Sequence, residues 1–289
     1  MQHRTLGRTG LQVTEIGFGG APAGLRNYLG KWEPDSDESA RLVESAITHA
    51  VERGINYFDT APGYGAGASE SMFGRALKPH RERVVLATKF TGSTEADVQA
   101  TTEASLRRLE TNYIDVLQYH GGWYTEADYE RFVRPGGVLA GLHAVRKAGL
   151  VRHIGFTSEG ANGITSRLIA TDEFDVMQIC YNLIFQHPYD PTRKAGVLYE
   201  AEAHRMGVVT MRPLTSGIFQ HWLRHIDPTI EQRVDLPKAL LAFVLSNPFV
   251  DVAIIGMRSP ARVDTNIAIA DDESARLDLD EIHNRYVQG

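Results

Sequence analysis

Four side chains whose types fit proton transfer lie at or just after the ends of consecutive apolar segments in this sequence. They are Asp59, Tyr64, Lys89 and His120. A phenol has an ordinary pKa of about 10, and a neighbouring lysine ammonium lowers that pKa and makes the phenol a better acid. A carboxylate holds the ammonium in place and keeps it charged, and an imidazole can orient the oxygen that receives the proton. The set therefore predicts general acid catalysis at a carbonyl group that is being reduced.

Taken singly, each of these residues has an ordinary structural explanation: a turn aspartate, a loop tyrosine, a surface lysine and a core histidine. Their joint position favours catalysis, because the C-terminal ends of neighbouring parallel strands converge. The alternative chemistry is a Schiff-base lysine of the kind that aldolase-type barrels use. A carboxylate partner at Asp59 would hold Lys89 protonated and non-nucleophilic, which argues against that alternative.

The elements that must position these residues alternate along the chain. Eight short apolar segments are predicted as strands: residues 15–18, 57–59, 84–88, 116–120, 153–157, 176–181, 208–211 and 252–255. Apolar residues three and four apart predict helices between them, including residues 38–53, 95–109, 138–148 and 237–246. This alternation predicts an α/β fold in which a single (β/α)8 TIM barrel domain spans residues 1–289.

Two further elements are expected outside the barrel repeat. Residues 5–13 place glycine-rich turn chemistry between two short β-like runs, which predicts an N-terminal β-hairpin. We expect this hairpin to cap the N-terminal end of the barrel and keep water from its core. Residues 277–282 are expected to begin a short C-terminal helix.

Composition excludes several classes of partner. Thirty basic and thirty-six acidic residues give a formal net charge of −6, which disfavours a polyanion-binding surface, so we expect no nucleic-acid partner. No apolar run approaches the roughly 20 residues that span a bilayer, and the N-terminus lacks the apolar core of a signal peptide. We therefore expect a soluble, cytoplasmic protein without a membrane partner.

Cysteine and histidine usage indicates neither disulfides nor metal. The single cysteine, Cys180, lies in a predicted strand and is expected to be a small core residue rather than a nucleophile. His221 and His225 are four residues apart, but no carboxylate or third ligand accompanies them in the pattern of a zinc site. We expect no metal.

Several motifs spread along the chain occur in a specific combination. They are Leu-Gly-Arg-Thr-Gly at 6–10, Gly-Phe-Gly-Gly at 17–20, Asp-Thr-Ala-Pro-Gly-Tyr-Gly at 59–65, Lys89, His120 and a segment at 255–266. In this combination the whole chain resembles the aldo-keto reductase family. The resemblance implies an NAD(P)-dependent oxidoreductase on a (β/α)8 barrel, with Tyr64 as general acid and the other three residues as its supports. Such proteins bind the nicotinamide cofactor without a Rossmann fold, so a missing dinucleotide fingerprint is no objection.

The resemblance also implies the cofactor contacts. Ser158 and Gln178 match residues that hold the nicotinamide carboxamide, and Met211 stands where an aromatic side chain usually stacks on the nicotinamide. The other implied cofactor-binding positions are Gly19, Gly20, Arg212, Pro213, Leu214, Gly217, Gly256, Arg258, Arg262 and Asn266. Arg258 and Arg262 favour NADP over NAD, because a guanidinium pairs with phosphate through a planar fork. A solvated helix face is the alternative explanation of these arginines, and NAD is the alternative cofactor.

Three positions depart from the family pattern. Glu159 replaces an asparagine beside Ser158, so a carboxamide contact loses its donor and keeps an acceptor. The thioether of Met211 is a softer platform than an aromatic ring. Thr265 replaces a carboxylate that often contacts the adenine, which weakens the inference of NADP preference.

The residues around the expected substrate are less specific. Trp32, Trp123 and Glu159 are candidate substrate contacts, together with Gln186 and His187. The aromatic rings could form an apolar wall, stack on a sugar ring or simply pack their loops. The polar companions favour a polyhydroxylated or polar carbonyl compound, and the chain resembles the short-loop branch that includes aldose dehydrogenases and pyridoxal-type reductases.

The leading hypothesis is an NADP-preferring oxidoreductase that interconverts a carbonyl, such as an aldehyde, ketone or sugar lactol or lactone, with an alcohol. The alternative is a non-enzymatic, nucleotide-sensing partner protein on the same barrel. The sequence specifies neither the physiological substrate, nor the direction of catalysis, nor the oligomeric state.

Overall fold

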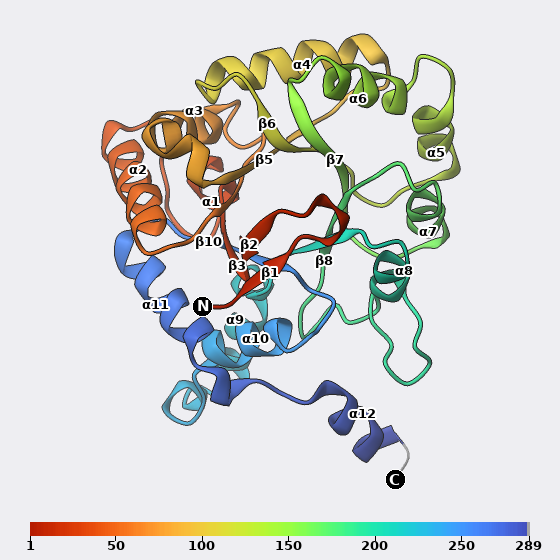
Figure 1. Cartoon of the computed structure of the whole chain (residues 1–289). Coiled ribbons are helices and arrows are strands. Elements are labelled where there is room, and N and C mark those ends of the chain that lie inside the picture. Colours follow the sequence, from red (N-terminus) through yellow and green to blue (C-terminus); the bar gives the residue numbers. More distant parts are fainter. Residues whose placement is uncertain (288–289) are drawn as a thin grey trace.

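A computed structural model describes residues 1–287, and within them eight parallel strands close into a barrel in the order β10-β3-β4-β5-β6-β7-β8-β9. The strands are β3 (Ile16–Gly19), β4 (Tyr57–Asp59), β5 (Val85–Phe90), β6 (Ile114–Tyr119), β7 (Val151–Ser158), β8 (Val176–Cys180), β9 (Gly207–Met211) and β10 (Val252–Gly256). Helices surround them in Figure 1. The predicted (β/α)8 fold is therefore confirmed. Residues 288–289 of the predicted domain lie outside the described residues.

The helices follow the strands around the barrel. Four helices were predicted with residue ranges, and each lies within one residue of its predicted bounds. They are α2 (Asp37–Glu52), α4 (Glu95–Arg108), α6 (Val138–Lys147) and α10 (Leu236–Leu245). The others are α1 (Ala21–Gly24), α3 (Ala68–Leu77), α5 (Glu126–Val133), α7 (Gly163–Ala170), α8 (Val197–Ala203), α9 (Ile218–Ile226), α11 (Pro260–Asp271) and α12 (Leu279–Val287). In α4, Thr94 and Asp97 form a capping box, which satisfies backbone N–H groups at the helix start and defines it locally.

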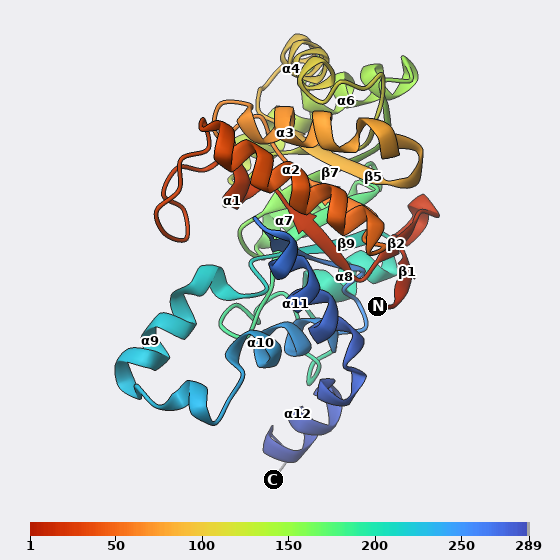
Figure 2. The ribbon, with the colours of Figure 1, turned by 90° about the vertical axis from the view of Figure 1, so that its left-hand side faces the viewer.

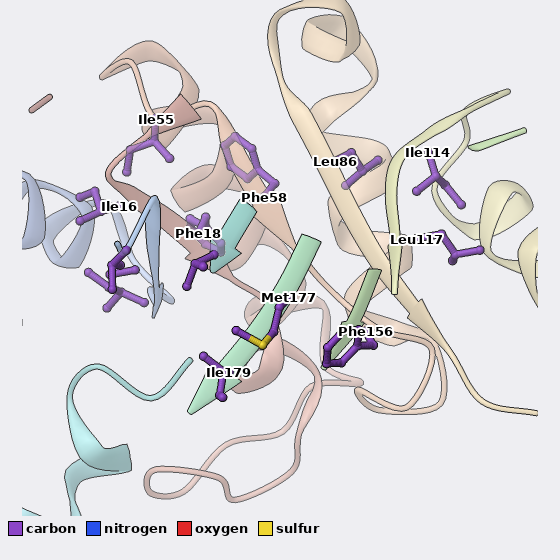
Figure 3. Packing of buried hydrophobic residues seen from close by; sticks show 14 of the residues in the cluster. Ile16, Phe18, Ile55, Phe58, Leu86, Ile114, Leu117, Phe156, Met177 and Ile179 are labelled. Atoms are coloured by element: carbon purple, nitrogen blue, oxygen red, sulfur yellow. The ribbon is translucent and has the colours of Figure 1, made fainter. Parts of the chain in front are cut away.

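Strand side chains divide between the barrel interior and the surrounding helices, because successive residues of a strand point to opposite faces. On β4, Tyr57 belongs to the inner apolar cluster with Val85, while Phe58 packs outward. Figure 3 shows this outer layer, in which Phe58, Leu86 and their neighbours lie between strands and helices. Both faces of the sheet are therefore buried, which explains why the strands are almost continuously apolar.

The predicted N-terminal hairpin is confirmed. Strands β1 (His3–Thr5) and β2 (Gln12–Thr14) pair antiparallel around a short 3-10 turn, and Figure 1 shows them lying across one end of the barrel. Leu6 and Val13 are fully buried and pack with the inner cluster of the barrel. The hairpin thus closes the end of the barrel at which the parallel strands begin.

The C-terminal segment runs back along the outside of the barrel. Helix α12 begins at Leu279, two residues later than expected, and the Asp278 carboxylate accepts a hydrogen bond from the Glu281 N–H near its start. Arg276 donates to the buried Glu15 carboxylate at 3.0 Å, which attaches the segment to the start of β3. Figure 2 shows α9 extending away from the barrel and α12 at the opposite end from α4. Across residues 1–287, no helix combines the length and apolar character needed to cross a membrane.

Candidate active site

The four proton-handling residues meet at the C-terminal ends of three neighbouring strands. Asp59 is the last residue of β4, Lys89 is the penultimate residue of β5, and His120 directly follows β6. The Lys89 ammonium donates to Oδ1 of Asp59 at 2.6 Å and to the backbone oxygen of Thr60 at 2.9 Å. The strand register brings these positions together, since Asp59 pairs with Ala87 on the adjacent strand.

Tyr64 reaches this group from the loop between β4 and α3. Its ring meets the His120 ring edge to face with centroids 5.7 Å apart, and Lys89 Nζ lies 5.0 Å from the Tyr64 ring centroid. The loop can pack tightly because Gly24 has no side chain: a Cβ there would lie 2.2 Å from the Tyr64 backbone oxygen. Gly65, at φ 69°, takes a left-handed conformation that favours glycine and turns the chain directly after the tyrosine.

Burial and pairing set the charges of Asp59 and Lys89. Burial raises the pKa of the Asp59 carboxyl above its ordinary value, while the charge of Lys89 opposes that rise. Burial by itself would lower the pKa of Lys89, but the Asp59 carboxylate and the Tyr64 phenol raise it above its ordinary value. The ammonium therefore stays charged at neutral pH, held in its ion pair with Asp59.

The pKa of Tyr64 differs from the sequence-based expectation. Burial raises the pKa of the phenol above its ordinary value, and the Lys89 ammonium only partly offsets that rise. The phenol is consequently protonated at neutral pH and able to donate. The sequence predicts a lowered pKa because it shows the neighbouring lysine but not the desolvation that tertiary packing imposes on the phenol.

His120 is neutral in this environment. Burial, with the nearby Lys89 charge, lowers the pKa of the imidazole to about 4. A neutral imidazole offers one N–H donor and one acceptor. It can therefore donate a hydrogen bond to a substrate oxygen next to the Tyr64 hydroxyl while itself carrying no charge.

A cavity of about 580 Å³ opens beside these residues at the C-terminal ends of the strands. Predicted site residues on its wall are Gly19, Asp59, Tyr64, His120, Glu159, Gln178, Met211, Arg212, Pro213, Leu214, Gly217, Gly256 and Arg262. The sequence analysis missed others, including Leu25, Tyr28, Ser216, Gln220 and Arg224. The hydroxyls of Tyr28 and Ser216 bond to each other at 2.9 Å, so the loops after β3 and β9 meet beside the cavity. Loop residues of this kind carry no spacing signal in sequence.

A second cavity of about 270 Å³ adjoins the first near the start of α11. Arg258, Arg262, Thr265 and Asn266 line it, and the two cavities share wall residues such as Leu214 and Arg262. Arg258 lies over the Trp32 ring at 4.5 Å and donates Nη2 to the Leu29 backbone oxygen, while its buried Nη1 has no hydrogen-bond partner. This uncompensated cationic donor suits an anionic ligand.

Several predicted residues lie away from the cavity around Tyr64. Trp32, expected near the substrate, instead supports Arg258, and its indole N–H donates to the Ala23 backbone oxygen. Gly20 faces α3, because a Cβ there would lie 2.6 Å from Ser69 Oγ. Trp123 is 61% exposed and stacks on His187 with centroids 6.3 Å apart.

The Ser158 side chain also lies differently from the implied carboxamide contact. It is fully buried, and its hydroxyl donates to the Gly160 backbone oxygen at 2.6 Å within its own loop. Beside it, Glu159 forms a two-pronged ion pair with Arg212, whose Nη2 lies 2.8 Å from Glu159 Oε1. This pair links the ends of β7 and β9 across the cavity wall.

The residues present fit a dinucleotide cofactor in an extended form. The two adjoining cavities lead from Tyr64 and His120, which line the first, to Arg258, which lines the second. Gly256 belongs to the wall of both, and a Cβ there would lie 2.3 Å from Pro22. In contrast, the described residues contain no group of three or more side chains able to hold a metal ion.

An eight-stranded parallel barrel with its cavity at the C-terminal strand ends is the architecture of (β/α)8 enzymes. The family model described as "Aldo/keto reductase family" matches residues 15–236. The chain therefore belongs to the aldo/keto reductase family and is an NAD(P)-dependent oxidoreductase.

Relatives and solved structures agree with this membership. L-galactose dehydrogenase of Arabidopsis thaliana is 27% identical over 305 residues, covering 96% of this chain and 91% of that protein. A probable voltage-gated potassium channel subunit beta of the same plant is 28% identical over 235 residues, covering 75% of this chain and 65% of that protein. An aldo/keto reductase from Klebsiella pneumoniae, solved with NADP and acetate, shares the fold with a TM-score of 0.76 at 22% identity, covering 98% of this chain and 94% of that one.

Proposed function

We propose that this protein is an NADP-preferring oxidoreductase that interconverts a small polar carbonyl compound and its alcohol, with Tyr64 as the general acid and base. The observation that carries the proposal is the buried ion pair of Asp59 and Lys89 beside the Tyr64 ring. An ammonium held next to a phenol stabilises the phenolate that remains after proton donation. Lys89 itself is fully buried behind Asp59 and Tyr64, which line the cavity.

In the reducing direction, the substrate carbonyl oxygen lies between Tyr64 and His120. A nicotinamide cofactor held between Gln178 and Arg258 would supply the hydride for the carbonyl carbon. Tyr64 then gives its proton to the oxygen, and Lys89 stabilises the resulting phenolate. Asp59 keeps Lys89 charged and in place, while the neutral His120 orients the substrate oxygen. In the oxidising direction, the Tyr64 phenolate takes the proton back.

The preference for NADP rests on the second cavity. Arg258 offers a buried nitrogen without a partner, and Arg262 lines both cavities at the start of α11. The side chain of Ser259 makes no capping hydrogen bond to this helix, so the positive end of its dipole is available to a phosphate. A likeness in fold to the Klebsiella pneumoniae reductase solved with NADP supports the same choice.

The substrate class is proposed more broadly, as a sugar-type aldehyde or lactol. Glu159 and Arg212 place charged hydrogen-bonding groups on the cavity wall, which suits hydroxyl groups. The similarity to L-galactose dehydrogenase supports a sugar substrate. We further propose that the chain forms one catalytic domain acting in the cytoplasm on small molecules, without a nucleic-acid partner.

Turnover assays test this function. Oxidation of NADPH should be followed with a panel of aldehydes and ketones, and reduction of NADP with a panel of aldoses, each against NADH or NAD. We expect turnover with at least one polar carbonyl or sugar and a higher kcat/KM with NADP(H). Tight cofactor binding without turnover on any member of either panel would instead support a nucleotide-sensing role. A preference for NADH would remove the NADP assignment.

A further inference from the structure

Two consecutive residues in the first turn of α3, Ser69 and Glu70, tie this helix to the strands that carry the proton-handling residues. Both side chains are fully buried. The Ser69 hydroxyl bonds to the Thr60 hydroxyl at 2.8 Å, and the Thr60 backbone oxygen accepts from Lys89. The backbone N–H of Ser69 donates to the Tyr64 backbone oxygen at 3.2 Å, so the placement of α3 also places the Tyr64 loop.

Glu70 connects α3 to β5, the strand that carries Lys89. Its Oε1 accepts a hydrogen bond from the Thr88 hydroxyl at 2.7 Å, and both groups are buried. Successive strand residues point to opposite faces, so Thr88 faces outward toward α3 while Lys89 faces into the barrel. Holding Thr88 on the outer face therefore directs Lys89 inward, toward Asp59 and Tyr64.

Arg108, the last residue of α4, completes this link. Its Nε donates to Oε2 of Glu70 at 2.6 Å. The arginine side chain also crosses the start of α3, where Gly67 leaves room for it: a Cβ on Gly67 would lie 2.5 Å from Arg108 Cδ. Gly67, at φ 94°, ends the loop that holds Tyr64. Arg108 and Glu70 together therefore fix the Tyr64 loop against the strand of Lys89.

The separation between Tyr64 and Lys89 matters for proton transfer. The attraction between an ammonium and a phenolate falls with distance, so the separation decides how well Lys89 stabilises the charge left on Tyr64. Lys89 Nζ lies 5.0 Å from the centroid of the Tyr64 ring. Lys89 is held by β4 through Asp59, whereas Tyr64 comes from a loop whose position depends on α3. A direct link between α3 and β5 keeps the two side chains in register.

We propose that Glu70 is a positioning residue that holds Tyr64 and Lys89 at the separation that proton transfer requires. It acts through Thr88 on one side and Arg108 on the other, and it does not line the cavity itself. The inference rests on the proposed function, in which Tyr64 donates the proton. A buried ion pair adds little stability compared with well-packed apolar residues, so orientation explains the Glu70 carboxylate better than stability does.

Two conservative variants of Thr88 test the proposal. Thr88→Val keeps the size of the side chain and removes the hydroxyl that bonds to Glu70, whereas Thr88→Ser keeps the hydroxyl and removes the methyl group. We measure kcat and KM with NADPH and glyceraldehyde, a small polar aldehyde. Thr88→Val should lower kcat about tenfold with KM unchanged within about twofold, since a misplacement of about 1 Å can cost roughly 10²-fold in rate. Thr88→Ser should keep kcat within about twofold of wild type.

Thr102→Val is the matched control. Thr102 is also fully buried, and its hydroxyl donates to the Val98 backbone oxygen within α4 at 2.7 Å. Thr88→Val and Thr102→Val should lower the midpoint of urea unfolding by similar amounts, but only Thr88→Val should lower kcat. Equal losses of kcat in the two valine variants, or a loss in Thr88→Ser as large as in Thr88→Val, would indicate a packing role and overturn the proposal.

Glu70→Gln tests the centre of the link. It keeps the size of the side chain and removes the charge that binds Arg108, so kcat should fall here too. The double variant with Thr88→Val should be no slower than the slower single variant, because both changes break the same link. Losses that simply add would overturn the proposal. Should Glu70→Gln fail to fold, judged by circular dichroism, the Thr88 variants decide the matter.

Tyr64→Phe separates this inference from the proposed function. If Tyr64→Phe loses turnover while Thr88→Val keeps the parent kcat, the positioning role of Glu70 is overturned and the proposed function stands. If Tyr64→Phe keeps the parent kcat, the proposed function falls and this inference falls with it.

Discussion

The ammonium nitrogen of Lys89 lies 2.6 Å from Oδ1 of Asp59, and each side chain is only 1% exposed. Neither charge has access to bulk water, so each depends on the other for compensation. Removing one partner from a buried pair leaves an isolated charge, which is far more destabilising than removing both. This pair should therefore contribute to folding stability as well as to catalysis.

Lys89→Met tests both contributions. We expect the free energy of unfolding to fall by about 3–5 kcal/mol, because the Asp59 carboxylate is left buried without its cation. The double variant Asp59→Asn with Lys89→Met should recover much of that loss, yet both variants should have little turnover. Urea unfolding and steady-state kinetics measure the two effects. A double variant no more stable than Lys89→Met would contradict the explanation.

Tyr64→Phe removes the proposed transferable proton and little else. We expect turnover to fall by about 10² to 10⁴-fold, the usual contribution of general acid catalysis. The dissociation constant for NADPH, followed by fluorescence, should stay close to that of wild type. If the phenylalanine variant keeps the parent kcat on a good substrate, another group donates the proton.

His120 should remain neutral well below the ordinary pKa of histidine. Its pKa is lowered from 6.5 to about 4 in the folded protein by burial and by the Lys89 charge. Between these two values the unfolded chain binds a proton that the folded chain does not, so stability must decline as the pH falls through this range. Nuclear magnetic resonance titration of the imidazole checks the pKa directly. Urea unfolding at pH 7 and pH 5 should show a smaller decline for His120→Asn than for wild type.

The arginines near α11 should discriminate between the two cofactors. A charge-assisted hydrogen bond contributes about 1.5–3 kcal/mol, so Arg258→Ala or Arg262→Ala should weaken NADPH binding by roughly one to two decades. NADH, which lacks the 2′-phosphate, should lose much less. Arg75→Ala, which removes a surface arginine paired with Glu44, is the matched control. Equal losses for both cofactors would show that these arginines do not read the phosphate.

Much of this fold could be predicted from sequence, because short apolar runs predict the strands and apolar residues three and four apart predict the helices between them. The bounds of β4, Tyr57–Asp59, coincide with the prediction. Strand β5 extends to Phe90 and so contains Lys89, because hydrogen bonds with β6 continue the ladder to the pair Phe90 and Tyr119. Such extensions depend on the neighbouring strand and not on the segment's own residues.

The convergence of Asp59, Tyr64, Lys89 and His120 was also determined by sequence, since the ends of neighbouring parallel strands in a barrel must lie together. Tertiary structure alone decided how deeply those residues are buried and which side chains they contact. Burial, not the lysine, governs the pKa of Tyr64, and desolvation depends on every layer packed around the ring. The hydroxyls of Tyr28 and Ser216 meet beside the cavity only because the fold brings loops distant in sequence within hydrogen-bond reach.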